Sequence, residues 1–443
     1  MFSNKDLRKL IIPLVIEQLL AVTIGMADTV MVSSCGEAAV SGISLVDSIN
    51  FLLITLFSSL ATGGAVIASQ YIGRGDHKSA SLAAKQLFYA SLALSAVLGV
   101  IAVFFREPVL NMVFGSIEAD VMAHAQIYFL LSAISYPFLA VYNAGAALFR
   151  SMGDSRTTML ISILMNTINI VGNAILIYGF QMAAAGAAAA SLVSRAVGAI
   201  IITVLLLNPR RIIFYDKLHK PEIHLSMLKS ILQIGVPNGL ENSIFQIGKI
   251  LVASIVSGFG TISITANAVA GNLASLQVIP GMALGMAMIT VVGQCIGAKD
   301  YEAVKKYTKK LMLITYGVVW AMTLLMLLFS KQILSFYSLS EETTTMTMEV
   351  FIVHGICAVI VWPLAFALPN ALRAANDVRF TMIVSLLSMW IFRIGFSYVL
   401  AIYFNMGILG TWIAMCIDWF CRGACFVIRF ARGKWKNISF IDN

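Results

Sequence analysis

Residues 83–105 read AAKQLFYASLALSAVLGVIAVFF. Apart from Lys85 this stretch carries no charged side chain, and it is longer than the about 20 apolar residues that a helix needs to cross a bilayer. The whole chain has the same character, because 59% of its 443 residues are hydrophobic and 12% are charged. Soluble domains average about 25% charged residues. Such a chain cannot cover its surface with polar groups, so its solvent must be lipid.

Eleven further apolar runs of similar length fall into two sets around the middle of the chain. The first set is completed by runs at about 7–33, 45–72, 121–146, 156–180 and 185–207. The second set lies at about 230–257, 268–297, 306–329, 347–370, 379–404 and 408–431. The sequence therefore predicts an all-α membrane protein with twelve transmembrane helices, and no soluble domain. We expect an N-terminal six-helix lobe over 1–207, a cytoplasmic linker over 208–229 and a C-terminal six-helix lobe over 230–443.

The distribution of positive charge predicts the orientation of the helices. The formal net charge is +9, and the chain has 30 lysines and arginines. Two of these, Arg106 and Lys331, lie in predicted outside loops, and four, Arg195, Lys249, Arg393 and Arg422, are assigned to the interior of predicted helices. The other 24 lie in segments that alternate along the chain, as the positive-inside rule requires. We therefore expect both termini in the cytoplasm, and we attribute the excess charge to topology and not to nucleic-acid binding.

An internal repeat relates the two sets of runs. When the chain is shifted against itself so that Pro13 meets Pro237, Glu17 meets Glu241 without a gap. The same shift aligns Gln70-Tyr-Ile-Gly73 with Gln294-Cys-Ile-Gly297. Each set contains an even number of helices, so the two repeats have the same orientation in the membrane. Parallel repeats of this kind predict two lobes around a central cleft, the architecture of alternating-access transporters.

Acidic residues inside the predicted helices are candidates for function. A charge at the bilayer centre costs at least about 2.5–3.5 kcal/mol, so an acid there needs a reason. Glu17 and Asp28 lie eleven residues apart on one face of the first helix. Pseudo-symmetry predicts that Glu17 and its counterpart Glu241 face one substrate cleft, where they would attract a cation. A structural ion pair is the alternative for each acid.

Three asparagines give the fifth predicted helix a polar stripe. Asn166, Asn169 and Asn173 have the spacing i, i+3, i+7 and so share one face. Their carbonyl oxygens suit Na⁺, and their amides suit a protonatable aspartate. Asn166 is assigned to the substrate cleft. Hydrogen bonding between helices is the alternative for the stripe, and Ser191 on the sixth helix is a candidate hydroxyl ligand.

Five short motifs, in their order along the chain, resemble those of the multidrug and toxic compound extrusion (MATE) transporter family. They are Gly25-Met-Ala-Asp28-Thr-Val-Met, Gln70-Tyr-Ile-Gly73, Asn169-x3-Asn173, Gly186-Ala-Ala and Gly235-Val-Pro237-x3-Glu241. The resemblance covers essentially the whole chain. It implies a two-lobe fold in the plasma (inner) membrane, with export of cationic amphipathic compounds in exchange for Na⁺ or H⁺. It also implies that Asp28, Asn169, Asn173 and Ser191 form the cation-coupling site, with Na⁺ at the first three.

Other functions fit the sequence less well. A lipid-linked oligosaccharide flippase shares the two-lobe plan and would need basic groups to meet phosphate, for which Arg195 and Arg393 are candidates. An enzyme is not expected, because the chain has no HExxH, GxSxG or P-loop motif and no cysteine metal cluster. We expect no cofactor. The expected partners are small-molecule substrates and membrane lipid, and the chain is expected to act as a monomer.

Overall fold

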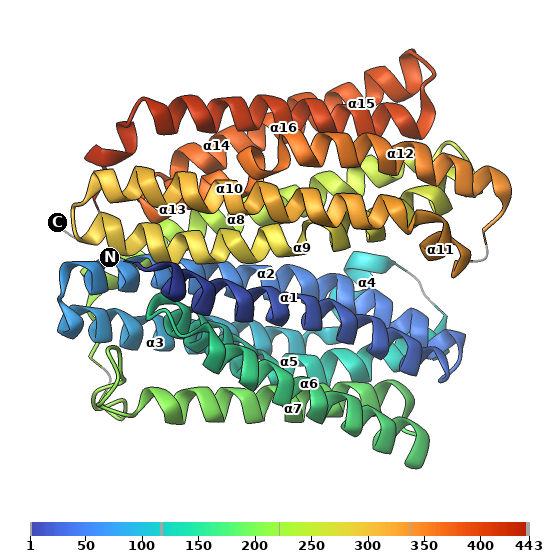
Figure 1. Ribbon diagram of the computed structural model, residues 1–443. Coiled ribbons are helices and arrows are strands. Elements are labelled where there is room, and N and C mark those ends of the chain that lie inside the picture. The colour runs from blue at the N-terminus through green and yellow to red at the C-terminus, as the bar shows by residue number, and fades with distance from the viewer. Residues whose placement is uncertain (1, 116–117, 221, 338, 440–443) are drawn as a thin grey trace. The chain divides into compact units, whose positions relative to one another are not determined.

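A computed structural model describes residues 2–115, 118–220, 222–337 and 339–439. Within these residues every regular element is helical, as Figure 1 shows. The chain divides into two compact units, one from Phe2 to Gly239 and the other from Leu240 onward. The division falls inside α8 (Leu225–Ser257). The predicted lobe and linker boundaries, which include residues 221 and 440–443 outside the described ranges, stay a prediction.

The first unit is built from long helices that run side by side (Figure 1). Its elements are α1 (Asn4–Ser33), α2 (Glu37–Arg74), α3 (His77–Phe104), α4 (Arg106–Phe114), α5 (Ala119–Ser151), α6 (Ser155–Asn173), the π-helix η1 (Ala174–Gly179), α7 (Ala183–Leu206) and the first part of α8. α5 lies at the centre, in contact with α2, α3 and α7. α6 packs against α7 and α1. This arrangement brings α1, α6 and α7 together, and they carry the candidate coupling residues.

The second unit follows the same plan with more interruptions. Its elements are the rest of α8, α9 (Thr261–Gly297), α10 (Tyr301–Leu328), α11 (Ser330–Ser335), α12 (Glu341–Ile360), η2 (Pro363–Ala367), α13 (Leu368–Ala374), α14 (Val378–Ser388), η3 (Met389–Gly395), α15 (Phe396–Tyr398), η4 (Val399–Tyr403), α16 (Gly407–Ala431) and η5 (Lys434–Asn437). α9 packs against α10, α12 and α13. α16 packs against η2, η3, α15 and η4.

Most of the predicted spans correspond to helices that are long and apolar enough to cross a membrane. Among the described residues, eleven helical segments meet both criteria for crossing a membrane. The first predicted run, 7–33, forms α1, whose 30 residues also exceed the length that a bilayer requires. The predicted all-α membrane fold is therefore confirmed. The short helices α4 and α11 in the connections were not predicted.

Aspartates begin corresponding helices of the two repeats. The carboxylate of Asp76 accepts a hydrogen bond from the backbone N–H of Ser79 at 3.0 Å and caps α3. Asp300, its counterpart in the second repeat, accepts from the N–H of Ala303 at 2.9 Å and caps α10. Hydrogen bonds from the side chain and backbone of Ser79 lower the pKa of Asp76. An ionised aspartate at this position satisfies a free N–H and complements the helix dipole.

Wide π-helical turns interrupt several spans. η1 follows Asn173 directly at the end of α6, and η3 follows α14. The apolar run 347–370 predicts one helix, but α12 ends at Ile360 and the chain continues as η2 and α13. Pro363 explains the break, because a proline has no N–H to donate to the preceding turn. Turns of this type occur frequently at functional sites.

Gly410 allows close packing in the second unit, and we expect Gly410→Ala to destabilise the protein. A Cβ there would lie 2.7 Å from the backbone nitrogen of Ala401 and 2.8 Å from the carbonyl carbon of Leu400. Because both atoms are backbone, η4 would have to move, at about 1–3 kcal/mol. Thermal unfolding in detergent measures the change. Gly271→Ala in α9 is the matched control, since its Cβ would meet nothing within 4 Å.

Candidate functional site

The carboxylate of Asp28 lies in a polar cluster within the first unit. Asp28 is partly buried on α1. The side-chain nitrogen of Asn173, at the end of α6, donates a hydrogen bond to its Oδ1 at 2.7 Å. Among the described residues no ion pair includes Asp28. The carboxylate is therefore held by neutral amides and keeps its capacity to take up a proton or a cation.

Asn169 connects Asp28 to α7. In the amide orientation that gives both the nitrogen and the oxygen of Asn169 a hydrogen-bond partner, the nitrogen donates to the two carboxylate oxygens of Asp28 at 2.7 and 3.1 Å. The amide oxygen then accepts from the hydroxyl of Ser191 at 3.0 Å. The i, i+4 spacing of Asn169 and Asn173 places both on one face of α6. The structure thus brings together the four residues that were assigned to cation coupling.

Asn166 does not join this cluster. Its side-chain nitrogen donates to the hydroxyl of Ser162 on the same helix at 3.3 Å. The predicted stripe is therefore divided, with Asn169 and Asn173 directed to Asp28. The assignment of Asn166 to a substrate cleft stays a prediction.

A second carboxylate near this cluster was missed from the sequence. Asp47 on α2 accepts hydrogen bonds from the hydroxyl of Tyr128 at 3.0 Å and from the side-chain nitrogen of Asn50 at 3.2 Å. Tyr136 in turn donates to Asn50 Oδ1 at 2.8 Å. Asp47 lies near the start of the apolar run 45–72, a position typical of an acid at a helix end. Asp47 was not recognised as a candidate because the helix was expected to begin close to it. In the structure α2 begins at Glu37, which places Asp47 well inside the helix.

Arg195 supplies positive charge to the same region. It lies on α7 and donates to the hydroxyl of Ser135 on α5 at 2.7 Å. Its charge acts on both Asp28 and Asp47 without a direct ion pair among the described residues. Arg195 thus places a positive charge near the two acids of this unit, Asp28 and Asp47.

Glu17 is placed away from Asp28, in a separate buried contact. Its Oε2 accepts from the hydroxyl of Thr158 on α6 at 2.8 Å, and its Oε1 lies 3.6 Å from Nη1 of Arg150 on α5. The side chain is 9% exposed. The sequence spacing put Glu17 and Asp28 on one face of α1, but each finds its own partners. The structural ion pair that was the alternative for Glu17 is present.

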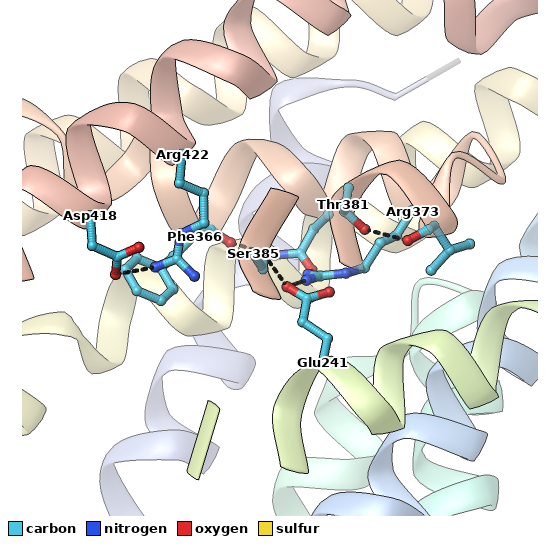
Figure 2. Close-up of polar contacts among 9 residues, drawn as sticks. Glu241, Phe366, Arg373, Thr381, Ser385, Asp418 and Arg422 are labelled. Carbon is cyan, nitrogen blue, oxygen red and sulfur yellow. Dashed lines mark hydrogen bonds and ion pairs between the residues drawn. The ribbon is translucent and has the colours of Figure 1, made fainter. Parts of the chain in front are cut away.

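Glu241 makes the corresponding contact in the second unit. Figure 2 shows its carboxylate between Arg373 and Ser385, with Oε1 2.7 Å from Arg373 Nη2 and 2.7 Å from the Ser385 hydroxyl. Arg373 also donates to Asn370 Oδ1 at 2.9 Å. In the register that pairs Glu17 with Glu241, Arg150 and Arg373 correspond to within one position. Both repeats therefore neutralise their buried glutamate with an arginine, and a substrate-binding role for Glu17 or Glu241 stays a prediction.

A second buried group in the second unit contains more positive than negative charge. Asp418 on α16 is fully buried, and its Oδ2 lies 3.7 Å from Arg422 and 3.9 Å from Arg393. Figure 2 shows Arg422 beside the ring of Phe366, whose centroid is 4.3 Å from the guanidinium carbon. The ring of Phe245 lies 5.3 Å from Arg393. The i, i+4 spacing of Asp418 and Arg422 on α16 is that of a local helix pair, but no local pattern indicates that Arg393 shares the same carboxylate.

The two units differ in the chemistry that their buried groups allow. In the first unit an unpaired carboxylate is surrounded by amide and hydroxyl groups, which can serve as hydrogen-bond donors or as oxygen ligands. In the second unit Glu241 and Asp418 each face at least one guanidinium group. The first unit therefore contains the candidate site for a small cation.

Comparisons with known proteins agree with this architecture. The chain is 29% identical to a protein of Bacillus cereus named "Probable multidrug resistance protein NorM", over 95% of this chain and 93% of the relative. It is 26% identical to the "Uncharacterized transporter YisQ" of Bacillus subtilis, over 96% and 93% of the two chains. A solved structure described as the outward-facing conformation of a multidrug resistance MATE family transporter superposes with a TM-score of 0.89 at 20% identity, covering 98% of this chain and 97% of that chain.

A family model also matches the chain twice. The MatE model covers residues 13–175 and again residues 237–399. The two matches begin at Pro13 and Pro237, the residues that the internal repeat aligns, and they are equal in length. They support the internal repeat and span most of the chain. The chain thus belongs to the MatE family and is a multi-pass membrane transporter.

Proposed function

We propose that this transporter exports amphipathic small molecules in exchange for Na⁺ or H⁺, and that Asp28 binds the coupling cation. One observation carries the proposal: a carboxylate in a membrane-spanning helix is held by amides and not by a basic side chain. An acid in that position is functional by default, because a permanently buried charge needs compensation. Multidrug resistance proteins are among the relatives, which supports drugs and related compounds as cargo.

The side chains around Asp28 suit both candidate cations. Asn173 Oδ1 is buried and has no hydrogen-bond partner among the described residues. Half a turn of either amide would exchange its nitrogen for its oxygen and present a carbonyl to Na⁺ beside the carboxylate. With H⁺, the protonated Asp28 would instead donate to one of these oxygens. Protonation removes the charge that orients the two amides, and a bound Na⁺ compensates it.

Exchange follows if the cation and the cargo prefer different conformers. A cation that binds one conformer more tightly shifts the population toward it, and cargo that prefers the other is released. Each positive charge that moves inward through the membrane potential supplies about 2.3 kcal/mol per 100 mV. The proposal places the protein in the plasma (inner) membrane with both termini in the cytoplasm. Action as a monomer without a cofactor stays a prediction, as does the central cleft.

The charge of the cargo is a separate question. A cationic cargo was expected partly because Glu17 and Glu241 would attract it. Both acids are paired with arginines of their own unit. Cationic compounds stay a prediction, and the proposal depends only on amphipathic character.

Reconstitution tests the proposed exchange. We expect liposomes containing the protein to release a loaded fluorescent drug when one cation gradient is imposed, and not when the other is imposed. Na⁺ and pH gradients are applied separately at matched membrane potential. Dissipating the effective gradient with an ionophore should return release to the rate of protein-free liposomes. Equal release with and without any gradient would contradict exchange.

The lipid-linked oligosaccharide flippase is the second candidate function. The buried arginines of the second unit favour it, since a flippase must accommodate phosphate. The amide-bound Asp28 favours exchange. A flippase would move its lipid in the absence of a Na⁺ or pH gradient, so the same liposome assay separates the two functions.

A further inference from the structure

We propose that Lys249, Arg393 and Arg422 form a binding site for the anionic group of an amphipathic substrate, a carboxylate or a phosphate. We call these three residues the basic cluster. All three lie in the second unit, whereas Asp28, Asn169 and Asn173 belong to the first. The proposal concerns the substrate of the proposed exporter and so assumes that the protein moves amphipathic molecules, but the site itself can be tested without transport.

The first argument is the balance of charge. Asp418 is the acid that contacts the cluster, and its Oδ2 faces both Arg393 and Arg422. Lys249 and Arg393 act on each other as like charges. The nearby carboxylate of Glu241 is already matched by Arg373 at 2.7 Å. Two arginines thus share one carboxylate inside a membrane-spanning bundle, where unbalanced charge is expensive, and Lys249 adds a third positive charge.

The second argument is the set of unused hydrogen-bond donors. Arg422 is 3% exposed, yet among the described residues its Nε and one terminal nitrogen have no acceptor. Nε of Arg393 also has no acceptor there. The distances from Asp418 to the two guanidinium groups, 3.7 and 3.9 Å, are too long for hydrogen bonds. A carboxylate or phosphate fits such donors because arginine presents a planar fork of N–H groups.

The third argument is the apolar surface next to the donors. The rings of Phe245 and Phe366 are 6.2 Å apart, edge to face. Arg422 lies over both rings, 5.7 Å from Phe245 and 4.3 Å from Phe366. A ligand with an anionic head and an aromatic or aliphatic body would find a partner for each part. Arg393 and Phe366 also lie on the π-helical segments η3 and η2, a local structure that is frequent at binding sites.

Lys249 provides the open edge of the cluster. It is exposed, and it lies one turn beyond Phe245 on the same face of α8. The preceding Gly248 packs against Met389 at the start of η3, which keeps α8 close to the segment that carries Arg393. Lys249 thus places an exposed positive charge one turn from Phe245, whose ring lies beside both Arg393 and Arg422.

Equilibrium binding to the full-length protein in nanodiscs of zwitterionic lipid tests the site. The probes share a pyrene body and differ in the head group: 1-pyrenebutyrate, pyrenebutyl phosphate, the methyl ester of pyrenebutyrate and a pyrenebutyl trimethylammonium salt. We expect at least one of the two anions to bind about tenfold more tightly than the ester, as charge-assisted hydrogen bonds predict. A preference for the phosphate over the carboxylate would favour phosphorylated substrates. Equal affinity for anions and ester would overturn the proposal.

Four variants separate binding from folding. Lys249→Gln changes an exposed side chain and should weaken anion binding several-fold, and Arg393→Gln should weaken it about tenfold. Asp418→Asn removes the competing carboxylate and should tighten anion binding, an outcome that damage to the fold would not give. Arg379→Gln, at an exposed arginine in the first turn of α14, is the matched control and should change nothing. Unchanged anion affinity in both Lys249→Gln and Asp418→Asn would refute the site.

These measurements use no ion gradient, so they report anion binding whether or not a gradient drives transport. If the anion binds but no gradient drives release from liposomes, the exchange proposal fails and the basic cluster stands. If release is driven but the anion binds no better than its ester, the cluster fails and the exchange proposal stands.

Discussion

Asp28→Asn is expected to abolish gradient-driven export while leaving the protein folded. The substitution keeps the size of the side chain and removes its charge. Without the carboxylate the site can neither take up a proton nor offer a charged ligand to Na⁺, so the cation no longer selects a conformer. We expect the driven rate of release to fall by more than about 100-fold, which corresponds to about 2.7 kcal/mol. The measurement is drug release from liposomes under the effective gradient.

The Asp28→Asn variant is expected to fold normally, because Asp28 forms no ion pair with any residue that the structure describes, and its hydrogen-bond partners are neutral. The amide oxygen that remains at position 28 can still accept from Asn173 or Asn169. The thermal unfolding midpoint in detergent should therefore change little. Asn166→Ala is the matched control on α6, since Asn166 bonds Ser162 and lies outside the cluster. Driven release at the normal rate in Asp28→Asn would remove Asp28 from the mechanism.

Glu241→Ala is expected to produce the largest loss of stability. It would leave the guanidinium group of Arg373 buried without its carboxylate, and the Ser385 hydroxyl without its acceptor. Removing one partner of a buried ion pair costs about 3–5 kcal/mol. Glu17→Ala should cost less, because the Arg150 contact is 3.6 Å long and Arg150 is 18% exposed. The thermal unfolding temperatures of the detergent-purified variants show which of the two substitutions destabilises the protein more.

Two further variants identify the cause of that loss. A double variant, Glu241→Met with Arg373→Met, should recover much of the stability, since replacing a whole buried pair by apolar residues is often neutral. Glu302→Ala, which removes an exposed pair with Lys305, should be indistinguishable from the unmodified protein. If Glu241→Ala unfolds at the same temperature as the unmodified protein but loses transport of cations, Glu241 binds substrate and is not a structural partner.

The fold could be predicted from the sequence to the level of helices and repeats. The run 83–105 and its eleven companions correspond to long helices, because the bilayer imposes a length and a polarity that a sequence must satisfy. The register that pairs Pro13 with Pro237 reappears in the two family matches. Helix ends were less predictable. α2 begins at Glu37, well before its apolar run, because a helix can extend past the hydrocarbon core into the interface.

The candidate sites were predictable only where their members lie close in the chain. Asn169 and Asn173 share a helix face by their spacing alone, and Asp28 was joined to them by resemblance. The contact of Glu241 with Arg373 joins α8 to α13, and that of Arg393 with Asp418 crosses from η3 to α16. No local pattern determines which charge meets which across such distances. The sequence therefore identified the buried acids but not the arginines that pair with them. Glu17 and Glu241, which were predicted to attract a cation, are each neutralised by an arginine of their own unit.

If Asp28 binds the coupling cation as proposed, the π-helical turn η1 would allow α6 to withdraw Asn173 from Asp28 without unfolding. Asn173 is the last residue before this turn, so the extra residue of the π-helix lies directly beside the coupling cluster. If that extra residue shifts by one position along the helix, Asn173 rotates by about 100° about the helix axis. Such a shift exchanges one backbone hydrogen bond for another and leaves the rest of the span in register. Loading of the cation and rearrangement of the helix can thus be a single local event, in which the bulge migrates along the backbone.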